Sequence, residues 1–204
     1  MTIQAILFDL GGVLLRTADF NPRERLAARL GMSRFELEQL IFGRESGDMA
    51  QRGEITVHQH YENLCQQLGY SMEQLQAMLE EFFTTDFLDQ DLVEYVRQLH
   101  RTYKTGLLSN ATDDLRKLIA VRWHFEDAFD DMVISAEVKL AKPDPRIFRL
   151  AVDRLGVIAG EAVFIDDMPH NVDAAVKVGL LGIHFQSPQQ LRFDLEGLLN
   201  GHPG

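Results

Sequence analysis

The apolar residues of this chain recur with two different periods, and each period predicts a different kind of element. Short runs rich in β-branched residues, closed by polar residues or glycine, are typical of strands. Such runs occur at residues 3–8, 105–108, 132–135, 162–165 and 181–185. Apolar residues at intervals of three and four are typical of helices. This second pattern occurs at residues 92–99, 115–123 and 145–155, after Asp167 up to Gly179, and after Ser187.

Residues 21–83 lack a convincing strand, and helix signals repeat there instead. Three pairs have the composition of helix N-termini. Asn21-Pro22 is expected as an N-cap followed by a first-turn proline, and Ser33 with Glu36 and Ser71 with Gln74 are expected as capping boxes. Gly31 is placed to end the first of these helices, and residues 56–69 carry apolar side chains at helical spacing. Residues 45–54, which contain two glycines, are the expected loop between the helices.

The two patterns divide the chain into two parts. Strands that alternate with helices predict right-handed crossovers and a mainly parallel sheet with helices on both faces. We therefore expect a doubly wound, Rossmann-like α/β core formed by residues 1–15 and 88–204. Residues 16–87, inserted after the first strand, are expected to form a helical cap. No element is expected in the tail from Asn200 onward.

Composition agrees with a packed protein outside the membrane. The chain has 204 residues, of which 46% are hydrophobic and 25% charged, so global disorder is excluded. No apolar run approaches the roughly 18 residues that span a bilayer. The N-terminus lacks a basic segment before its first apolar run, unlike a signal peptide. Cys65 is the only cysteine, so a reducing cytoplasm is the expected location.

The charge balance restricts the partners. Lys and Arg number 20 against 31 Asp and Glu, which gives a net charge of −11. Nucleic acids and anionic membranes require a basic surface that displaces counterions, so neither is expected as a partner. We expect a monomer or a weak dimer that acts on a small molecule.

Polar residues follow the predicted strands at the points where these strands end. They are Asp9, Ser109-Asn110 and Asp166-Asp167, and Lys142-Pro143 lies in the loop after the strand at 132–135. In open parallel sheets, ligands bind outside the carboxyl ends of the strands. The sequence therefore predicts that these side chains meet in one site.

Such a set suits phosphoryl transfer. A carboxylate can attack phosphorus to form an acyl phosphate. Acidic side chains hold Mg²⁺, which prefers oxygen ligands and keeps positions open for phosphate and water. A lysine and a hydroxyl then neutralise and orient the remaining phosphate oxygens.

These four segments, beginning with Asp9-Leu10-Gly11-Gly12-Val13, resemble the four motifs of the haloacid dehalogenase superfamily, in the same order and over nearly the whole chain. The helical insertion falls where that superfamily places its cap. The stretch Arg52-Gly53-Glu54-Ile55-Thr56 resembles the branch that contains bacterial α-D-glucose-1-phosphate phosphatase and the phosphatase domain of soluble epoxide hydrolase.

The resemblance implies a role for each matching residue. Asp9 would be the nucleophile, and Lys142 would hold both Asp9 and the phosphate. Phosphate binding is implied for Ser109, Asn110, Lys142 and Asn171. The implied cofactor is Mg²⁺, held by Asp9, the Gly11 carbonyl and Asp167, with Asp166 beside them. The implied activity is a magnesium-dependent phosphatase for a small phosphorylated metabolite, sugar phosphates included, that works through an aspartyl phosphate.

One position departs from the family pattern. Most phosphatases of the superfamily have an aspartate two residues after the nucleophile as general acid and base, and here that residue is Gly11. General acid catalysis is worth roughly 10²–10⁴-fold, so slower turnover or a good leaving group is expected. Three residues are candidate replacements: Asp19, His58 and His60.

Several alternatives stay open at this point. Asp9 and Asp166-Asp167 are also residues that end strands or cap helices. Lys139 competes with Lys142, although the proline after Lys142 and the helix that follows favour Lys142. A 2-haloacid dehalogenase and a member of the superfamily that binds without turnover are the alternative functions. Cys65 is expected to pack in the core.

Overall fold

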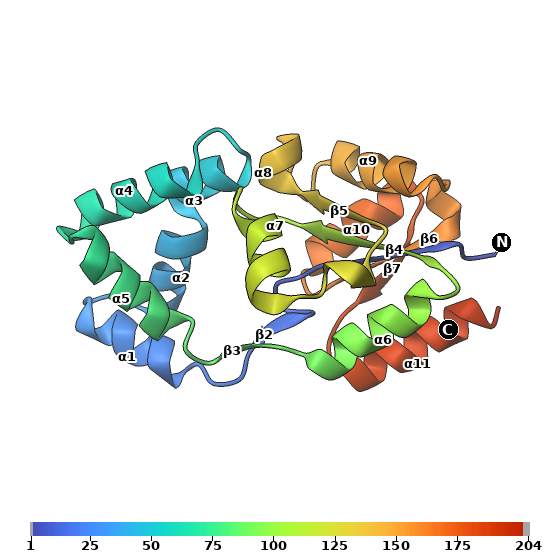
Figure 1. The fold of residues 1–204 in the computed structure, drawn as a ribbon, viewed down its shortest axis with the longest axis horizontal. Helices are drawn as coiled ribbons and strands as arrows, with labels where there is room; N and C mark the ends of the chain where they lie inside the picture. Colours follow the sequence, from blue (N-terminus) through green and yellow to red (C-terminus); the bar gives the residue numbers. More distant parts are fainter. Residues whose placement is uncertain (1, 202–204) are drawn as a thin grey trace.

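A five-stranded parallel sheet forms the centre of the protein, which we describe from a computed structural model covering residues 2–201 and, within them, all side chains except that of Arg44 (Figure 1). The strand order is β5-β4-β1-β6-β7. The strands are β1 (Ala5–Phe8), β4 (Lys104–Ser109), β5 (Asp131–Ile134), β6 (Ala162–Asp166) and β7 (Leu181–His184). All five correspond to runs expected from the sequence, and the α/β fold class is confirmed. Of the tail expected to be irregular, residues 202–204 lie outside the described residues.

Both faces of the sheet are buried, which explains why its strands read as continuous apolar runs. In β1, Ile6 and Phe8 pack into the apolar cluster on one face, while Ala5 and Leu7 pack into the cluster on the other. The helices that cover the sheet are α6 (Gln90–His100), α7 (Leu115–Leu118), α8 (Ser135–Val138), α9 (Pro145–Leu155), α10 (Pro169–Val178) and α11 (Pro188–Leu199). A π-helical turn (Ile119–Trp123) extends α7, and 3₁₀ turns occupy Glu126–Ala128 and Ala159–Glu161.

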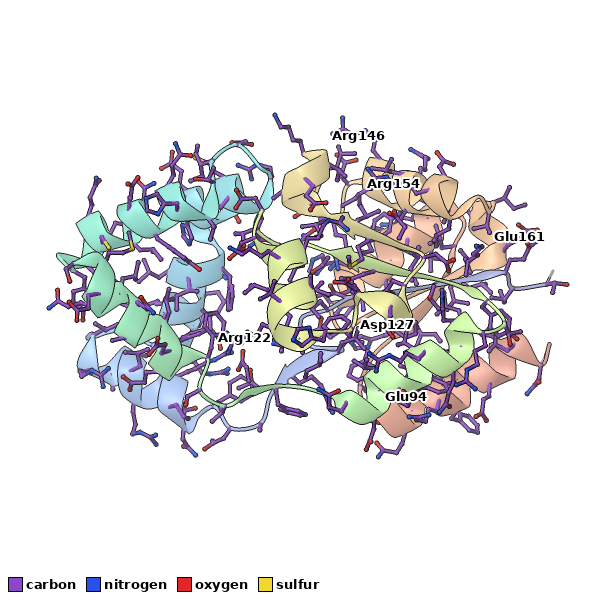
Figure 2. All side chains as sticks on the ribbon, viewed as in Figure 1. Glu94, Arg122, Asp127, Arg146, Arg154 and Glu161 are labelled. Atoms are coloured by element: carbon purple, nitrogen blue, oxygen red, sulfur yellow. The ribbon has the colours of Figure 1, made fainter. Side chains whose placement is uncertain are left out.

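Charged residues lie on the outside of these layers. Figure 2 shows Arg146, Arg154 and Glu161 projecting from the outer surface beside the sheet, and Glu94 on the outer side of α6. Among residues 2–201, no helix combines the length and apolar character that crossing a bilayer requires.

The helices within residues 21–82 form a separate bundle, which we call the cap. They are α1 (Asn21–Arg29), α2 (Arg34–Phe42), α3 (Arg44–Gln51), α4 (Val57–Leu68) and α5 (Met72–Phe82). The bundle lies beyond the carboxyl ends of the sheet strands and has its own apolar core (Figure 1). Cys65 packs against this core, as expected. The division into domains at residues 16 and 87 stays a prediction.

Local sequence signals explain most of the ends of the cap helices. Ser33 and Ser71 form the expected capping boxes, and Thr56 forms a third one with Gln59. Two expectations were wrong. Asn21 is the first residue of α1, and the N-cap is Phe20. Residues 45–54 are not a loop throughout, because α3 occupies Arg44–Gln51. The glycine signal at position 47 was misleading there, since tertiary packing overrides the low helix propensity of one glycine.

A two-stranded antiparallel ribbon, which no pattern in the sequence predicts, connects the cap to the core. The ribbon consists of β2 (Leu15–Thr17) and β3 (Asp86–Leu88). Arg23 of α1 ties the cap to this ribbon through two bonds from one guanidinium nitrogen to the Asp86 carboxylate, at 2.7 and 2.8 Å. The same carboxylate accepts the Thr17 hydroxyl at 2.8 Å. The Arg23 guanidinium also lies 4.1 Å from the centre of the Phe82 ring.

The Arg23→Ala variant should lower the free energy of unfolding by about 3 kcal/mol, because it leaves the largely buried Asp86 carboxylate without its cation. Urea unfolding followed by circular dichroism measures this change.

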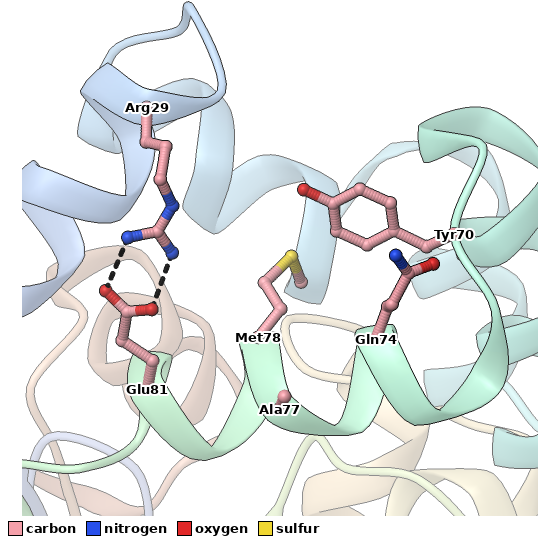
Figure 3. Close-up of a pocket in the computed structure, with 6 residues that line it drawn as sticks. All are labelled: Arg29, Tyr70, Gln74, Ala77, Met78 and Glu81. Carbon is pink, nitrogen blue, oxygen red and sulfur yellow. Dashed lines mark hydrogen bonds and ion pairs between the residues drawn. The ribbon is translucent and has the colours of Figure 1, made fainter.

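The matched control is Arg29→Ala, which breaks the exposed ion pair with Glu81 on the rim of a shallow cavity of the cap (Figure 3). That loss should cost less than about 1 kcal/mol, because solvent screens the pair. Equal losses in the two variants would contradict the role of Arg23.

Candidate active site

Strand pairing brings the sequence-predicted residues to one edge of the sheet. β1 lies between β4 and β6, with Phe8 opposite Leu107 on one side and Ile165 on the other. Asp9, Ser109 and Asp166 therefore emerge together at the carboxyl ends of three adjacent strands. Asp9 and Ser109 are buried, and Asp166 is fully buried.

Lys142 is buried between two of these carboxylates. Its Nζ lies 2.9 Å from Asp9 Oδ1 and 2.7 Å from Asp166 Oδ2, and 1% of its side chain is exposed. A buried ammonium requires such partners, because desolvation without them is costly. The rival lysine, Lys139, is exposed at the end of α8.

Asn110 holds the loop that carries Lys142. Its side-chain nitrogen donates to the Lys142 carbonyl at 2.9 Å, and its Oδ1 accepts the Lys142 N–H at 2.8 Å. The side-chain amide of Asn110 thus places the lysine, and the phosphate contact expected of this residue stays a prediction. Backbone partners of this kind are invisible to motif spacing.

Asn171 likewise contacts Asp166. Its side-chain nitrogen lies 3.1 Å from each oxygen of the Asp166 carboxylate, which also accepts the Met168 N–H at 2.8 Å. Asn171 is buried, and its Oδ1 has no hydrogen-bond partner among the described residues. The structure thus brings Asn171 to the site as a neighbour of Asp166, whereas the sequence predicts a phosphate contact.

Gly12 allows Asp167 to approach the turn after β1, a role that its place in the sequence motif does not predict. Its φ is +76°, in the left-handed region that favours glycine. A Cβ at this position would lie 2.2 Å from Asp167 Oδ2. The signal that could have revealed this role is the Gly11-Gly12 pair directly after the strand.

Asp9, Asp166 and Asp167 form an acidic cluster that could hold a metal ion. One carboxylate oxygen from each lies within 4.8 Å of the others. Fully ionised, these three carboxylates and the Lys142 ammonium leave two uncompensated negative charges, which one divalent cation would neutralise. All donors are oxygens, which suits Mg²⁺.

Burial raises the pKa values of two carboxyl groups of the cluster. Burial raises the pKa of Asp9 to about 7, although the Lys142 ammonium opposes this change, and the Asp166 carboxylate adds to the rise. Burial, followed by the Asp166 charge, also raises the pKa of Asp167. A cation at the cluster would favour the ionised forms and make the Asp9 carboxylate available at neutral pH.

None of the three candidates for the missing acid is placed at the cluster by a described contact. Asp19 accepts hydrogen bonds from the backbone and side chain of Asn21. His58 is exposed beside Glu62. His60 is buried inside the cap, between the Ser46 hydroxyl at 2.9 Å and the Ile41 carbonyl at 3.0 Å. Gly11 faces open space, since a Cβ there would meet no atom within 4 Å.

Comparison with known proteins places this geometry in a family. The model of the haloacid dehalogenase-like hydrolases matches residues 3–179. The chain belongs to this family. As a haloacid dehalogenase-like hydrolase, it combines the parallel sheet of the fold with the acidic cluster at the carboxyl ends of its strands.

Two curated relatives of this hydrolase span nearly the whole chain. A sesquiterpene phosphatase of Aspergillus oryzae is 28% identical over 90% of each chain. A phosphorylated carbohydrates phosphatase of Thermotoga maritima is 27% identical over 89% of this chain and 84% of its own.

A solved structure of the family has the same fold. The HAD family enzyme of Bacteroides thetaiotaomicron in complex with magnesium and inorganic phosphate is 25% identical and has a TM-score of 0.75. The match covers 93% of this chain and 98% of that one.

The Gly12→Ala variant should weaken binding of a divalent cation, because the added methyl group displaces the Asp167 carboxylate. We expect roughly 10–100-fold weaker Mg²⁺ affinity, the range for a disturbed ligand environment. Calorimetric titration with Mg²⁺ measures this affinity.

Gly11→Ala is the matched control, because it adds the same methyl group where the space is open and keeps the backbone carbonyl. It should bind Mg²⁺ within about twofold of the wild type, well below the range above. Equal loss in both variants would refute the specific contact at position 12.

Proposed function

We propose that this hydrolase is a magnesium-dependent phosphatase that acts through an aspartyl phosphate on Asp9. The observation that carries the proposal is the Lys142 ammonium, held within 2.9 Å of Asp9 inside a cluster that lacks two positive charges. Asp9, Asp167 and the Gly11 carbonyl would hold Mg²⁺, with Asp166 beside them. When bound, Mg²⁺ neutralises charge on the transferring phosphoryl group.

The residues of the chain then have separate roles in the reaction. Leu10 N–H, at 2.7 Å, and Lys142 both bind Asp9 Oδ1, which fixes the orientation of the attacking carboxylate. Asp9 attacks phosphorus, the bond from phosphorus to the leaving oxygen breaks, and an aspartyl phosphate forms. Water then attacks the phosphorus, which releases inorganic phosphate and restores the Asp9 carboxylate. Ser109 and Lys142 bind the phosphate oxygens.

We assign the substrate to the small phosphorylated metabolites, with sugar phosphates as the first group to test. The carbohydrate phosphatase of Thermotoga maritima supports this choice. The sesquiterpene phosphatase of Aspergillus oryzae matches over a similar length. The names of these two relatives indicate that the leaving group varies widely within the family, so the panel of substrates should extend beyond sugar phosphates. A cytoplasmic location and a monomeric or weakly dimeric state stay predictions.

Hydrolysis of p-nitrophenyl phosphate tests the reaction. Wild-type protein should turn over with Mg²⁺ and lose activity in EDTA, and Asp9→Asn should lower kcat by at least about 10³-fold, because an amide is a poor nucleophile. Circular dichroism checks that the variant stays folded.

Activity that persists in EDTA would refute the role of the metal, and activity that persists in Asp9→Asn would refute the nucleophile. Chloride release from 2-chloropropionate would favour the dehalogenase alternative instead. Absence of turnover across a panel of phosphorylated metabolites would favour a binding protein.

The Gly11→Asp variant should restore a general acid, since a side chain at this position enters open space. We expect kcat for alkyl phosphates, whose leaving groups need a proton, to rise about 10–100-fold. Turnover of p-nitrophenyl phosphate, whose leaving group departs as an anion, should change little.

The matched control for this gain is Gly11→Asn, which has a similar size and no acidic proton. It should show no gain with alkyl phosphates. A gain in both variants would show that the effect comes from the size of the side chain and not from proton donation.

A further inference from the structure

The cap contacts the core at a second place besides the β2–β3 ribbon. The segment from the end of α3 to the start of α4 lies against the core near α8, away from the ribbon (Figure 1). We call this the docking contact, formed by Gly53 and Val57 of the cap and by Asp113 and Ala136 of the core. It is close to the proposed phosphate-binding residues in sequence, since Asp113 follows Ser109-Asn110 in the same loop.

Gly53 allows the two backbones to approach each other. Its φ is +65°, and a Cβ at this position would lie 2.0 Å from the Ala136 carbonyl oxygen. No side chain fits there without a shift of the cap or of α8. The shape of the contact therefore depends on a bare backbone at position 53.

Asp113 supplies the polar part of the contact. Its Oδ1 accepts the Val57 N–H at 3.0 Å, at the first residue of α4. This N–H is one that the helix leaves unpaired, and a carboxylate is favourable beside the positive end of a helix. Thr56 and Gln59 pair with each other in the capping box, so the acceptor for the Val57 N–H comes from the core. Asp113 is exposed, so water competes for the bond.

The core side of the contact is continuous with the Lys142 loop. The Ser135 hydroxyl oxygen accepts the Ala111 N–H at 2.9 Å and lies 3.2 Å from the Ala111 carbonyl. Ser135 directly precedes Ala136, over which Gly53 sits. Asn110, next to Ala111, holds the Lys142 backbone from both sides. The loop that orients the catalytic lysine therefore also carries the residues that receive the cap.

We propose that Asp113 is a positioning residue. Its hydrogen bond to Val57, together with the close approach at Gly53, holds the cap in place over the site that contains Lys142. The catalytic part of this inference rests on the proposed phosphatase function. Loss of Asp113 should weaken binding of the leaving group, which faces the cap, and spare binding of the phosphate, which faces the core.

Hydrogen exchange of the Val57 amide tests the contact without any turnover. We expect Asp113→Ala to accelerate this exchange about tenfold or more, as loss of a protecting hydrogen bond does. Asp113→Asn keeps an oxygen acceptor and should restore most of the protection. Glu94→Ala, which removes an acid from the outer side of α6, is the charge-matched control and should leave the exchange unchanged. Unchanged exchange in Asp113→Ala would overturn the proposal.

Kinetics test the consequence for the site. For Asp113→Ala we expect KM for p-nitrophenyl phosphate to rise about 5–20-fold, while kcat and inhibition by inorganic phosphate stay within about twofold. The reason is that the variant loses only contacts with the leaving group, which stabilise the ground state and the transition state equally. Asp113→Asn should recover most of the wild-type KM. Gly53→Ala, which displaces the cap without a change of charge, should raise KM in the same direction.

Two outcomes would count against the positioning role. A parallel loss of kcat, phosphate inhibition and melting temperature in Asp113→Ala would indicate general structural damage and overturn it. An unchanged KM in a variant with accelerated exchange would overturn the link to the site. Failure of the phosphatase function has a different signature, because the wild type would then not hydrolyse p-nitrophenyl phosphate, or Asp9→Asn would keep the activity, whatever the exchange of Val57.

Discussion

The buried ammonium of Lys142 is the interaction on which the rest of the site depends. It lies between the carboxylates of Asp9 and Asp166 and joins the ends of two neighbouring strands. Asn110 fixes the backbone of the lysine, and Asn171 fixes the second carboxylate. Removal of the lysine would leave two buried acids facing each other, which is far costlier than the loss of one exposed pair. The lysine can bridge these two acids because β1 and β6 are neighbours in the sheet.

Local charge and total charge have different consequences in this protein. The net charge of −11 opposes the approach of a phosphate, but salt screens such fields over about 8 Å at physiological ionic strength. Within the site, the acids are partly matched by Lys142, and burial raises the pKa of Asp9, so a further positive charge would favour its ionised form. That polyanions are not partners stays a prediction from the acidic composition, and this prediction does not extend to a small phosphate ester.

Two glycines play equivalent parts at different places. Gly12 lets the Asp167 carboxylate approach the turn after β1, and Gly53 lets the cap approach the Ala136 carbonyl. Both have positive φ, so space and backbone conformation favour glycine independently at each position. The first approach shapes the acidic cluster, and the second sets how the cap lies over it. Both close approaches thus depend on positions that carry no side chain.

The sequence alone determined the five strands of the sheet, the helices that alternate with them and two of the capping boxes of the cap, because periodicity and capping depend on residues close together in the chain. It also indicated that Asp9, Ser109 and Asp166 meet, since the ends of parallel strands share one edge. Only the tertiary structure decided that Asn110 and Asn171 hold Lys142 and Asp166, that α3 forms despite Gly47, and that a β2–β3 ribbon carries the cap. The strands of this ribbon are three residues long and 68 residues apart, so neither has a pattern of its own. Hydrogen bonds between distant segments depend on the folded geometry, and local pattern does not encode them.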